Sequence, residues 1–284
     1  MIKIEGKKFD WFGLTQILKE HKGKLRQIRM LSVNELKKKY KGAALGPLWA
    51  LIKPTFTLFI LWFAFEIGLK RNGGVHFING KYTQFVFMLT GYVPWFYISE
   101  CIVGGSRSIR SNKQFVTKLS FPVSNIMTFT SLSGLYIHIL LCAIMYVVLL
   151  CLGFGPSIYN LQFIYYALMM YFFFLVLSWM TAPLSAFSKD FENLINSVIT
   201  GLFWLSGIFW NTYDISPLWL RKLMYFNPIN YFVNGYRKSF LTDTFIFDSN
   251  YTTETIVFYA EFILMIFLGA HTYKKFRKIL PDVL

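Results

Sequence analysis

Long apolar stretches alternate with short polar segments along most of this chain. A hydrocarbon core about 30 Å thick requires roughly 20 apolar residues per spanning helix. Inside lipid the backbone must satisfy its own hydrogen bonds, so stretches of this kind are predicted to be helices. Six stretches meet or approach that length, the fifth being short: residues 48–69, 83–103, 122–152, 161–187, 194–210 and 255–273. The pattern predicts an all-α integral membrane protein with six transmembrane helices.

The Lys and Arg residues fall mostly on one side of these stretches. If the N-terminus is cytoplasmic, 22 of the 29 Lys and Arg lie in cytoplasmic segments and seven lie outside. This is the bias that the positive-inside rule describes, so both termini are predicted to be cytoplasmic. The chain then divides into an N-terminal interfacial segment (residues 1–47), a transmembrane domain (48–273) and a cytoplasmic tail (274–284).

Composition supports a membrane protein and argues against a nucleic-acid-binding domain. The chain is 55% hydrophobic and 15% charged, and its mean hydropathy is +0.45. A soluble domain of this size carries more charge. The net charge of +15 sits at the ends of the apolar stretches, where attraction to anionic lipid headgroups contributes about 1 kcal/mol per charge. The three cysteines lie in or beside apolar stretches, and their positions give no disulfide or metal pattern.

The polar N-terminal segment has a helical apolar pattern. Between residues 10 and 41, apolar side chains recur at three-, four- and seven-residue steps, which places them on one helix face. Gly23 weakens the middle of this helix. Ser32 with Glu35 fits a capping box, which predicts that a second short helix begins at Ser32. We expect an amphipathic interfacial helix that contacts a partner protein; a plain lipid anchor is the alternative. The residues assigned to it are Trp11, Leu14, Leu18, Leu25, Glu35 and Tyr40.

Residues 104–121 are basic and contain no acidic residue. Apolar residues, including Phe115 and Leu119, alternate with the cations. A short amphipathic helix that ends at Phe121 and Pro122 fits this pattern. The apolar residues favour contact with another protein, because a purely topological signal has no use for them.

Residues 209–254 are predicted to lie outside. They are too apolar for a simple loop and, with Pro217, Pro228 and several charges, too interrupted for a span. Two short re-entrant or interfacial helices that meet at Asn227 and Pro228 fit this composition. An aromatic belt at the membrane interface is the alternative.

The chain carries no recognisable machinery for chemistry. It has no phosphate-binding loop of the kind that binds ATP, no Ser/His/Asp grouping and no metal-ligand cluster. Energy for transport would come from another polypeptide or from an ion gradient. Ionisable groups within apolar stretches are candidates for an ion relay, with a hydrogen-bonded structural role as the alternative: Glu66, Glu100, His138 and Glu261.

Five short motifs in order resemble the permease subunits of ABC-2 type exporters. They are residues 35–49 with Pro54, residues 91–96, residues 108–112 with Phe121 and Pro122, Lys189 with Asp190, and Asn227 and Pro228 with Tyr236 and Arg237. The resemblance covers nearly the whole chain. Within the family the best match is to the polysaccharide and teichoic acid exporters, and residues 273–277 and 282–284 are similar to the end of wall teichoic acid export permeases.

The resemblance implies a non-enzymatic permease in the bacterial cytoplasmic membrane. A homodimer would pair with two ABC ATPase subunits, which would hold ATP and Mg²⁺, and this chain would need no cofactor. The substrate would be a lipid-linked glycopolymer, with teichoic acid as the first expectation. The alternatives are an O-antigen, capsule polysaccharide or drug exporter in the same family, and an ion-coupled carrier or membrane scaffold of another class.

The resemblance also assigns two sets of site residues. The coupling set, which would dock on the ATPase, is Arg107, Arg110, Asn112, Lys113, Phe115 and Lys118. The extracellular gate set is Trp210, Trp219, Tyr225, Asn227 and Pro228.

Overall fold

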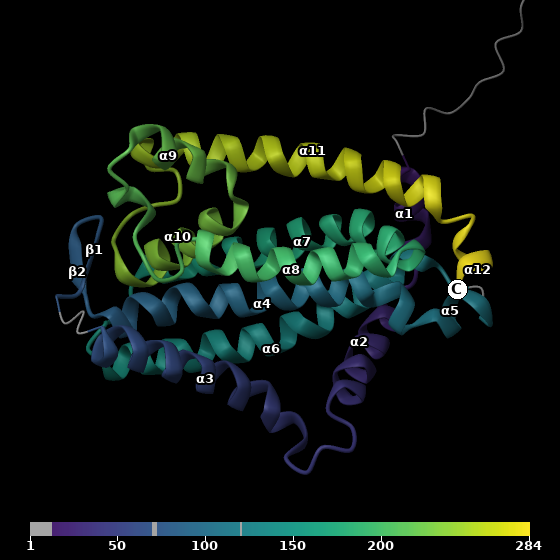
Figure 1. Ribbon diagram of the computed structural model, residues 1–284, viewed down its shortest axis with the longest axis horizontal. Helices are drawn as coiled ribbons and strands as arrows, with labels where there is room; N and C mark the ends of the chain where they lie inside the picture. Colours follow the sequence, from purple (N-terminus) through teal and green to yellow (C-terminus); the bar gives the residue numbers. More distant parts are fainter. Residues whose placement is uncertain (1–12, 70–72, 120) are drawn as a thin grey trace, which may run out of the picture.

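The computed structural model describes residues 13–69, 73–119 and 121–284 as a bundle of long helices with shorter elements at both ends (Figure 1). The elements are α1 (Leu14–His21), α2 (Leu25–Lys39), α3 (Trp49–Trp62), β1 (Val75–Phe77), β2 (Gly80–Tyr82), α4 (Gln84–Ser111), α5 (Lys113–Thr117), α6 (Val123–Cys151), α7 (Gln162–Phe187), α8 (Lys189–Leu205), α9 (Leu218–Leu223), α10 (Pro228–Leu241), α11 (Thr252–Phe276) and α12 (Leu280–Val283).

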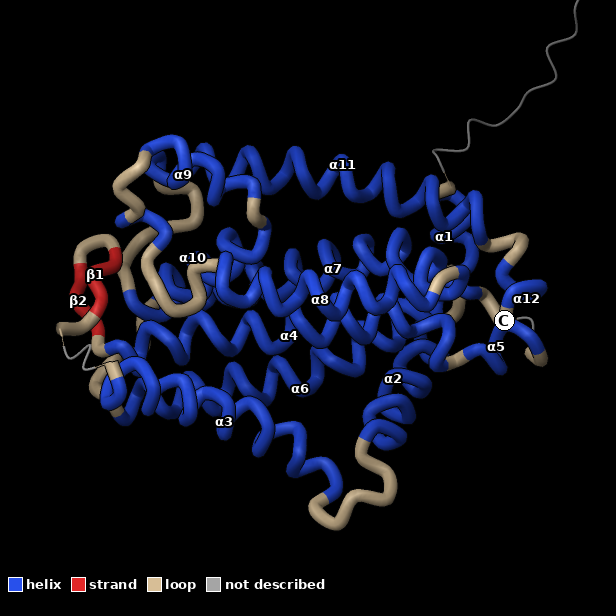
Figure 2. Tube along the Cα trace, viewed as in Figure 1, coloured by secondary structure: helices blue, strands red, loops and turns tan. Residues whose placement is uncertain are grey.

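Five helical segments are long and apolar enough to cross a membrane: Gly46–Gly68, Gln84–Ser111, Val123–Cys151, Ile158–Phe187 and Ser249–Phe276. They confirm the all-α class and give long apolar helices at five of the six expected positions. The remaining stretch forms α8, which has 17 residues and is not among the five, so a sixth span stays a prediction. The pattern of long apolar stretches did not predict the antiparallel hairpin of β1 and β2, shown in red in Figure 2.

Helix α4 lies at the centre of the bundle. It contacts α3, α6, α7, α8 and α10. Within its most apolar stretch of 18 residues, 78% is buried inside the protein. Helix α11 packs along α7 on the opposite side of the bundle from α3 (Figure 1). We call the end with α1, α5 and α12 the inner end, because the charge pattern predicts that it is cytoplasmic, and the end with α9 and the hairpin the outer end.

The N-terminal segment forms two helices that separate at Gly23, whose φ of 73° interrupts the helical path. The expected start of the second helix at Ser32 is wrong, because α2 begins at Leu25. The Ser32 hydroxyl donates to the Arg29 carbonyl (2.8 Å) and lies 3.1 Å from the Tyr136 hydroxyl on α6. Ser32 therefore lies within α2, where it packs against α6, and it does not cap the start of a helix.

The prediction that a loop begins at residue 104 is also wrong for its first half. Helix α4 continues to Ser111, so Arg107 and Arg110 lie on the central helix, and α5 has only five residues. Arg107 Nε lies 2.6 Å from Glu192 Oε1 on α8, and Arg110 donates to the Ser185 carbonyl on α7 (2.5 Å). Contacts with neighbouring helices thus extend α4 beyond its apolar stretch.

The helix pair at the outer end is confirmed, and its second member is an interior helix. Asn227 accepts a hydrogen bond from the Ile229 N–H (3.0 Å), and Pro228 occupies the first turn of α10, which suits a residue without an N–H. All residues from Ile229 to Leu241 are buried. Arg237 and Lys238 lie in the segment 209–254 that is predicted to be outside, yet they are only 0% and 4% exposed.

Candidate functional site

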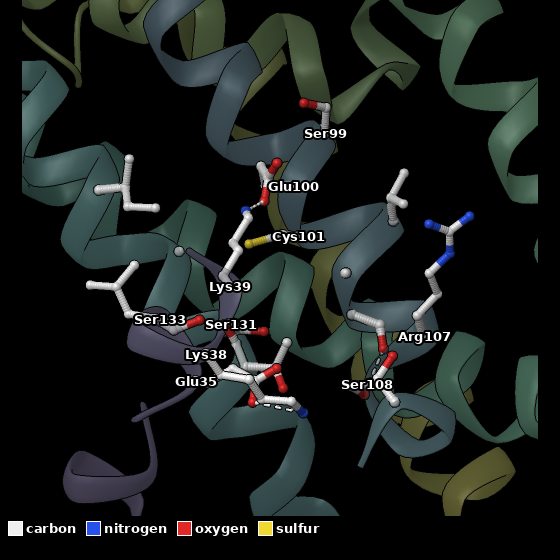
Figure 3. A pocket seen from close by; sticks show the side chains of 18 of the residues that line it. Glu35, Lys38, Lys39, Ser99, Glu100, Cys101, Arg107, Ser108, Ser131 and Ser133 are labelled. Atoms are coloured by element: carbon white, nitrogen blue, oxygen red, sulfur yellow. Dashed lines mark hydrogen bonds and ion pairs between the residues drawn. The ribbon is translucent and has the colours of Figure 1, made fainter. Parts of the chain in front are cut away.

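A polar pocket of about 620 Å³ opens between α2, α3, α4 and α6, with Ile199 of α8 at its border (Figure 3). Such a pocket is unusual among apolar helices, because every polar group removed from water needs a partner. Its charged and hydroxyl-bearing lining residues are Glu35, Lys38, Lys39, Lys53, Ser99, Glu100, Arg107, Ser108, Ser111, Thr130, Ser131 and Ser133.

Positive charge predominates in the lining, and one ion pair and one hydrogen bond tie the last turn of α2 to α4 and the residue that follows it. Lys39 forms a close ion pair with Glu100, drawn as a dashed line in Figure 3. Lys38 Nζ lies 3.8 Å from Glu35 Oε2 and donates to Asn112 Oδ1 (3.3 Å). Four lining cations (Lys38, Lys39, Lys53 and Arg107) face two lining carboxylates, and Glu192 of α8 neutralises Arg107. The small positive excess and the hydroxyls favour an anionic or polyhydroxylated ligand.

Two hydroxyls of α6 border the pocket and are buried without a partner in the part of the chain that the structure describes. Thr130 Oγ1 and Ser131 Oγ line the pocket and have no hydrogen-bond partner among the described residues, although Ser131 is only 2% exposed. An unsatisfied buried hydroxyl costs about 1–3 kcal/mol. Water or ligand hydroxyls in the pocket would remove that cost.

The predicted coupling residues separate into two groups. Arg107 and Arg110 bind α8 and α7, and Asn112 is buried and donates to the Ser108 carbonyl (3.2 Å). Lys113 and Lys118 are exposed at the inner end.

Phe115 is half-buried. Its ring lies 5.4 Å from Phe121 and 5.8 Å from Phe129, so it anchors α5 on α6. Leu119 is 64% exposed and is the apolar side chain of this segment that faces outward.

The predicted interfacial residues also differ in their surroundings. Glu35 lines the pocket, and Tyr40 follows the Lys38–Lys39 pair that binds α4. Leu18 and Leu25 are 69% and 77% exposed, as suits an apolar face against lipid or a partner, and Leu14 is half-buried. Trp11 lies outside the described residues.

The predicted gate residues surround the corner between α9 and α10. Asn227 Nδ2 donates to Ser206 Oγ (3.0 Å), which ties this corner to the end of α8. Trp210 Nε1 donates to the Trp204 carbonyl (3.3 Å), and Tyr225 is half-buried. Trp219 is 70% exposed on α9.

Arg237 belongs to neither of the predicted site sets, although its side chain fixes the outer end. Its guanidinium donates to the carbonyls of Gly207 (2.5 Å), Ile208 (2.7 Å) and Phe87 (3.2 Å). It also lies 3.4 Å from the centre of the Phe87 ring. The side chain thus joins α10, α4 and the segment after α8.

Gly91 makes room for this guanidinium. A Cβ at this position would lie 2.5 Å from Arg237 Nη2 and 2.9 Å from the Ile208 carbonyl oxygen. Two motifs of the sequence, residues 91–96 and Tyr236 with Arg237, therefore meet in space. Both motifs belong to the five that resemble the exporter permeases, and nothing in the sequence of either one indicates that they touch.

The ionisable groups of the apolar stretches are not bonded to one another within the described residues. Glu66 accepts from the Trp62 indole, and Glu100 pairs with Lys39. His138 Nε2 lies 2.5 Å from the Tyr236 hydroxyl. Glu261 Oε2 has no described hydrogen-bond partner. These separate contacts fit the structural role better than an ion relay.

The sequence comparison identifies the family of this bundle. Residues 26–241 match the ABC-2 type transporter family. The chain belongs to this family. It is therefore a multi-pass membrane protein and the non-catalytic permease subunit of an ABC transporter. It carries no cofactor, and ATP binds to an ATPase partner.

Two O-antigen export system permease proteins named RfbA are similar to this chain. The protein from Myxococcus xanthus is 25% identical over 207 residues, which are 72% of this chain and 76% of that protein. A protein from Klebsiella pneumoniae is 25% identical over 265 residues, which are 90% of this chain and 93% of that protein.

Proposed function

We propose that this chain is the permease of an ATP-driven exporter for a lipid-linked cell-surface polysaccharide of the O-antigen type. The observation that carries the proposal is the polar, net-positive pocket inside an otherwise apolar bundle. Its hydroxyls can bind sugars, and its cations can bind the phosphate that links a glycan to its lipid. Similarity to O-antigen export permeases over nine-tenths of the chain supports the same substrate class.

The pathway in this proposal runs along α4, between α3 and α8. Helices α3 and α8 both contact α4 and leave many apolar side chains exposed. A second copy that covers these faces would enclose the pocket, so the proposal includes a homodimer. The exposed residues Lys113, Lys118 and Leu119 at the inner end would contact the ATPase partner.

Teichoic acid is the second candidate substrate. The excess of cations in the pocket suits a polyol phosphate chain, because each repeat carries a negative charge. The general polysaccharide substrate has the additional support of the relatives, so it is the first choice.

An ATPase-stimulation experiment tests the role of the pocket in this proposal. The permease–ATPase complex in lipid nanodiscs should hydrolyse ATP faster when a lipid-linked polysaccharide is added, with half-maximal stimulation at a defined concentration. Lys39→Met should raise that concentration about tenfold, since it removes a charge-assisted contact of roughly 1.4 kcal/mol. Lys41→Met is the matched control, because Lys41 is exposed and does not line the pocket.

Stimulation that is identical in the two variants would contradict the role of the pocket. Stimulation by a small drug but by no glycan would contradict the substrate class.

A further inference from the structure

Helix α11 carries buried polar contacts at both of its ends and few along its length. Only 17% of the most apolar stretch of 18 residues within Ser249–Phe276 is buried inside the protein. At its inner end Tyr273 is fully buried, and at its outer end Glu254 is only 7% exposed. The two residues are about 28 Å apart at 1.5 Å per residue, which is close to the thickness of the hydrocarbon core.

The contacts at the inner end centre on Glu20 of α1. Glu20 Oε2 accepts from the Tyr273 hydroxyl (2.6 Å) and the Ser124 hydroxyl (2.6 Å). Glu20 Oε1 lies 3.3 Å from Arg277 Nη2. We call Glu20, Ser124, Tyr273 and Arg277 the inner node.

The inner node lies beside the connection between α4 and α6 (residues 112–122, which include α5), which we call the inner loop. Ser124 is in the first turn of α6, directly after Phe121 and Pro122. Helix α12, which follows α11, contacts α5. The inner end of α11 is therefore linked to the start of α6 through Glu20, and to α5 through α12.

The contacts at the outer end centre on Glu254. Glu254 Oε2 accepts from the buried Lys238 ammonium of α10 (3.3 Å) and from the Tyr213 hydroxyl (3.1 Å). The Lys238 ammonium also lies 3.5 Å from the centre of the Tyr251 ring. We call Lys238, Glu254, Tyr213 and Tyr251 the outer node. It fixes α11 to α10, whose neighbouring residue Arg237 binds α4 and the end of α8.

We propose that α11 is a strut that transmits movement of the inner loop to the outer end, and that Glu20 and Glu254 are its positioning residues. A charged hydrogen-bond network that is removed from water resists displacement more than apolar contacts do, because a separated charge would lie unpaired. Movement of α6 and α5 would therefore shift α11 as a unit, and α11 would shift α10. This inference rests on the proposed ATP-driven function.

The test uses three matched Glu→Gln variants in the purified permease–ATPase complex. Glu20→Gln and Glu254→Gln keep the shape of each node and remove its charge. In Glu20→Gln the amide cannot accept on both oxygens as the carboxylate does. In Glu254→Gln the amide oxygen can still accept both bonds, so this variant removes the charge that pairs with the Lys238 ammonium. Glu261→Gln is the control, since Glu261 lies on the same helix and its Oε2 has no described partner.

The readout is independent of the substrate. A Trp219→Cys substitution in each protein places a thiol on exposed α9, in a Cys151→Ser background because the native Cys151 thiol is also exposed. An impermeant maleimide then measures the labelling rate at residue 219 with and without ATP. Wild type should show an ATP-dependent change in rate. Glu20→Gln and Glu254→Gln should each reduce that change at least about fivefold, the low end of typical coupling between sites. Glu261→Gln should keep it within twofold.

The double variant is decisive. Substitutions this far apart normally have additive effects. If both act by releasing one strut, the double variant should show no greater loss than the stronger single variant. Additive losses, or an unchanged response in Glu20→Gln, would overturn the inference.

Two controls separate the possible failures. If Glu20→Gln does not assemble with the ATPase, Tyr273→Phe tests the same node by removing one hydroxyl. A wild-type complex without any ATP-dependent change would overturn the proposed function and this inference together. A change that persists in both variants overturns the strut alone.

Discussion

Replacement of Arg237 by Met should destabilise the outer end of the permease. Met has a similar length and keeps the apolar contacts of the side chain, but it donates no hydrogen bond. The Gly207 and Ile208 carbonyls would each lose a charged donor, at 2.5 and 2.7 Å. The Phe87 carbonyl also accepts from the Thr90 hydroxyl (3.2 Å), so its loss is smaller.

The size of the effect follows from these two bonds. A hydrogen bond to a charged group contributes about 1.5–3 kcal/mol, so two contribute roughly 3–6 kcal/mol. Removing a buried charge returns part of this, because its desolvation was unfavourable. We expect a net loss of about 3 kcal/mol in the free energy of unfolding. For a domain of this size, that corresponds to a fall of roughly 6–12 °C in the apparent Tm.

The assay is thermal unfolding of the detergent-solubilised permease, followed by size-exclusion chromatography after heating. Arg221→Met is the matched control, since Arg221 is half-buried in the same region and donates to one carbonyl, that of Tyr213 (3.1 Å). Its apparent Tm should fall by less than about 4 °C. Equal shifts for the two variants, or an Arg237→Met protein as stable as wild type, would refute the account of the Arg237 contacts.

Three further predictions address other parts of the molecule. Gly91→Ala should lower the apparent Tm by several degrees, because its Cβ would overlap the Arg237 guanidinium; normal stability would contradict that contact. Leu119→Asp should leave folding intact and weaken ATPase association, whereas Phe115→Asp should impair folding, as the elution profile and co-purification of the ATPase will report. An impermeant thiol reagent added outside should label a Cys introduced at Asn79 but not one at Asp282; the reverse would overturn the orientation.

The spanning helices could be predicted from the sequence because lipid imposes a simple rule. Each span must be apolar and of a fixed length, and this rule leaves a strong pattern in residues 122–152 and 255–273. The helix pair at Asn227 and Pro228 was also predictable, since proline and an amide cap have local effects.

Tertiary contacts explain the parts that the pattern could not predict. Helix α4 extends past its apolar stretch because Arg107 and Arg110 bind neighbouring helices. Ser32 and Glu35 have the spacing of a cap, but packing on α6 placed Ser32 inside α2. Arg237 and Lys238 resembled loop charges, and only the fold shows the acceptors that allow their burial. The polar pocket likewise combines residues from four separate helices.

The central claim is that this permease moves a lipid-linked polysaccharide across the membrane when its partner hydrolyses ATP. The most direct measurement is translocation in sealed vesicles that contain the purified complex, with a lipid-linked polysaccharide on the ATP-accessible side and a lectin or glycosidase on the other. The account predicts that the polysaccharide becomes accessible only with ATP, and that a polyol phosphate chain of similar length moves at least as well if the pocket cations contribute. Movement of the polyol phosphate alone would replace the O-antigen type by teichoic acid. Failure of both polymers to cross, with ATP hydrolysis intact, would contradict the account.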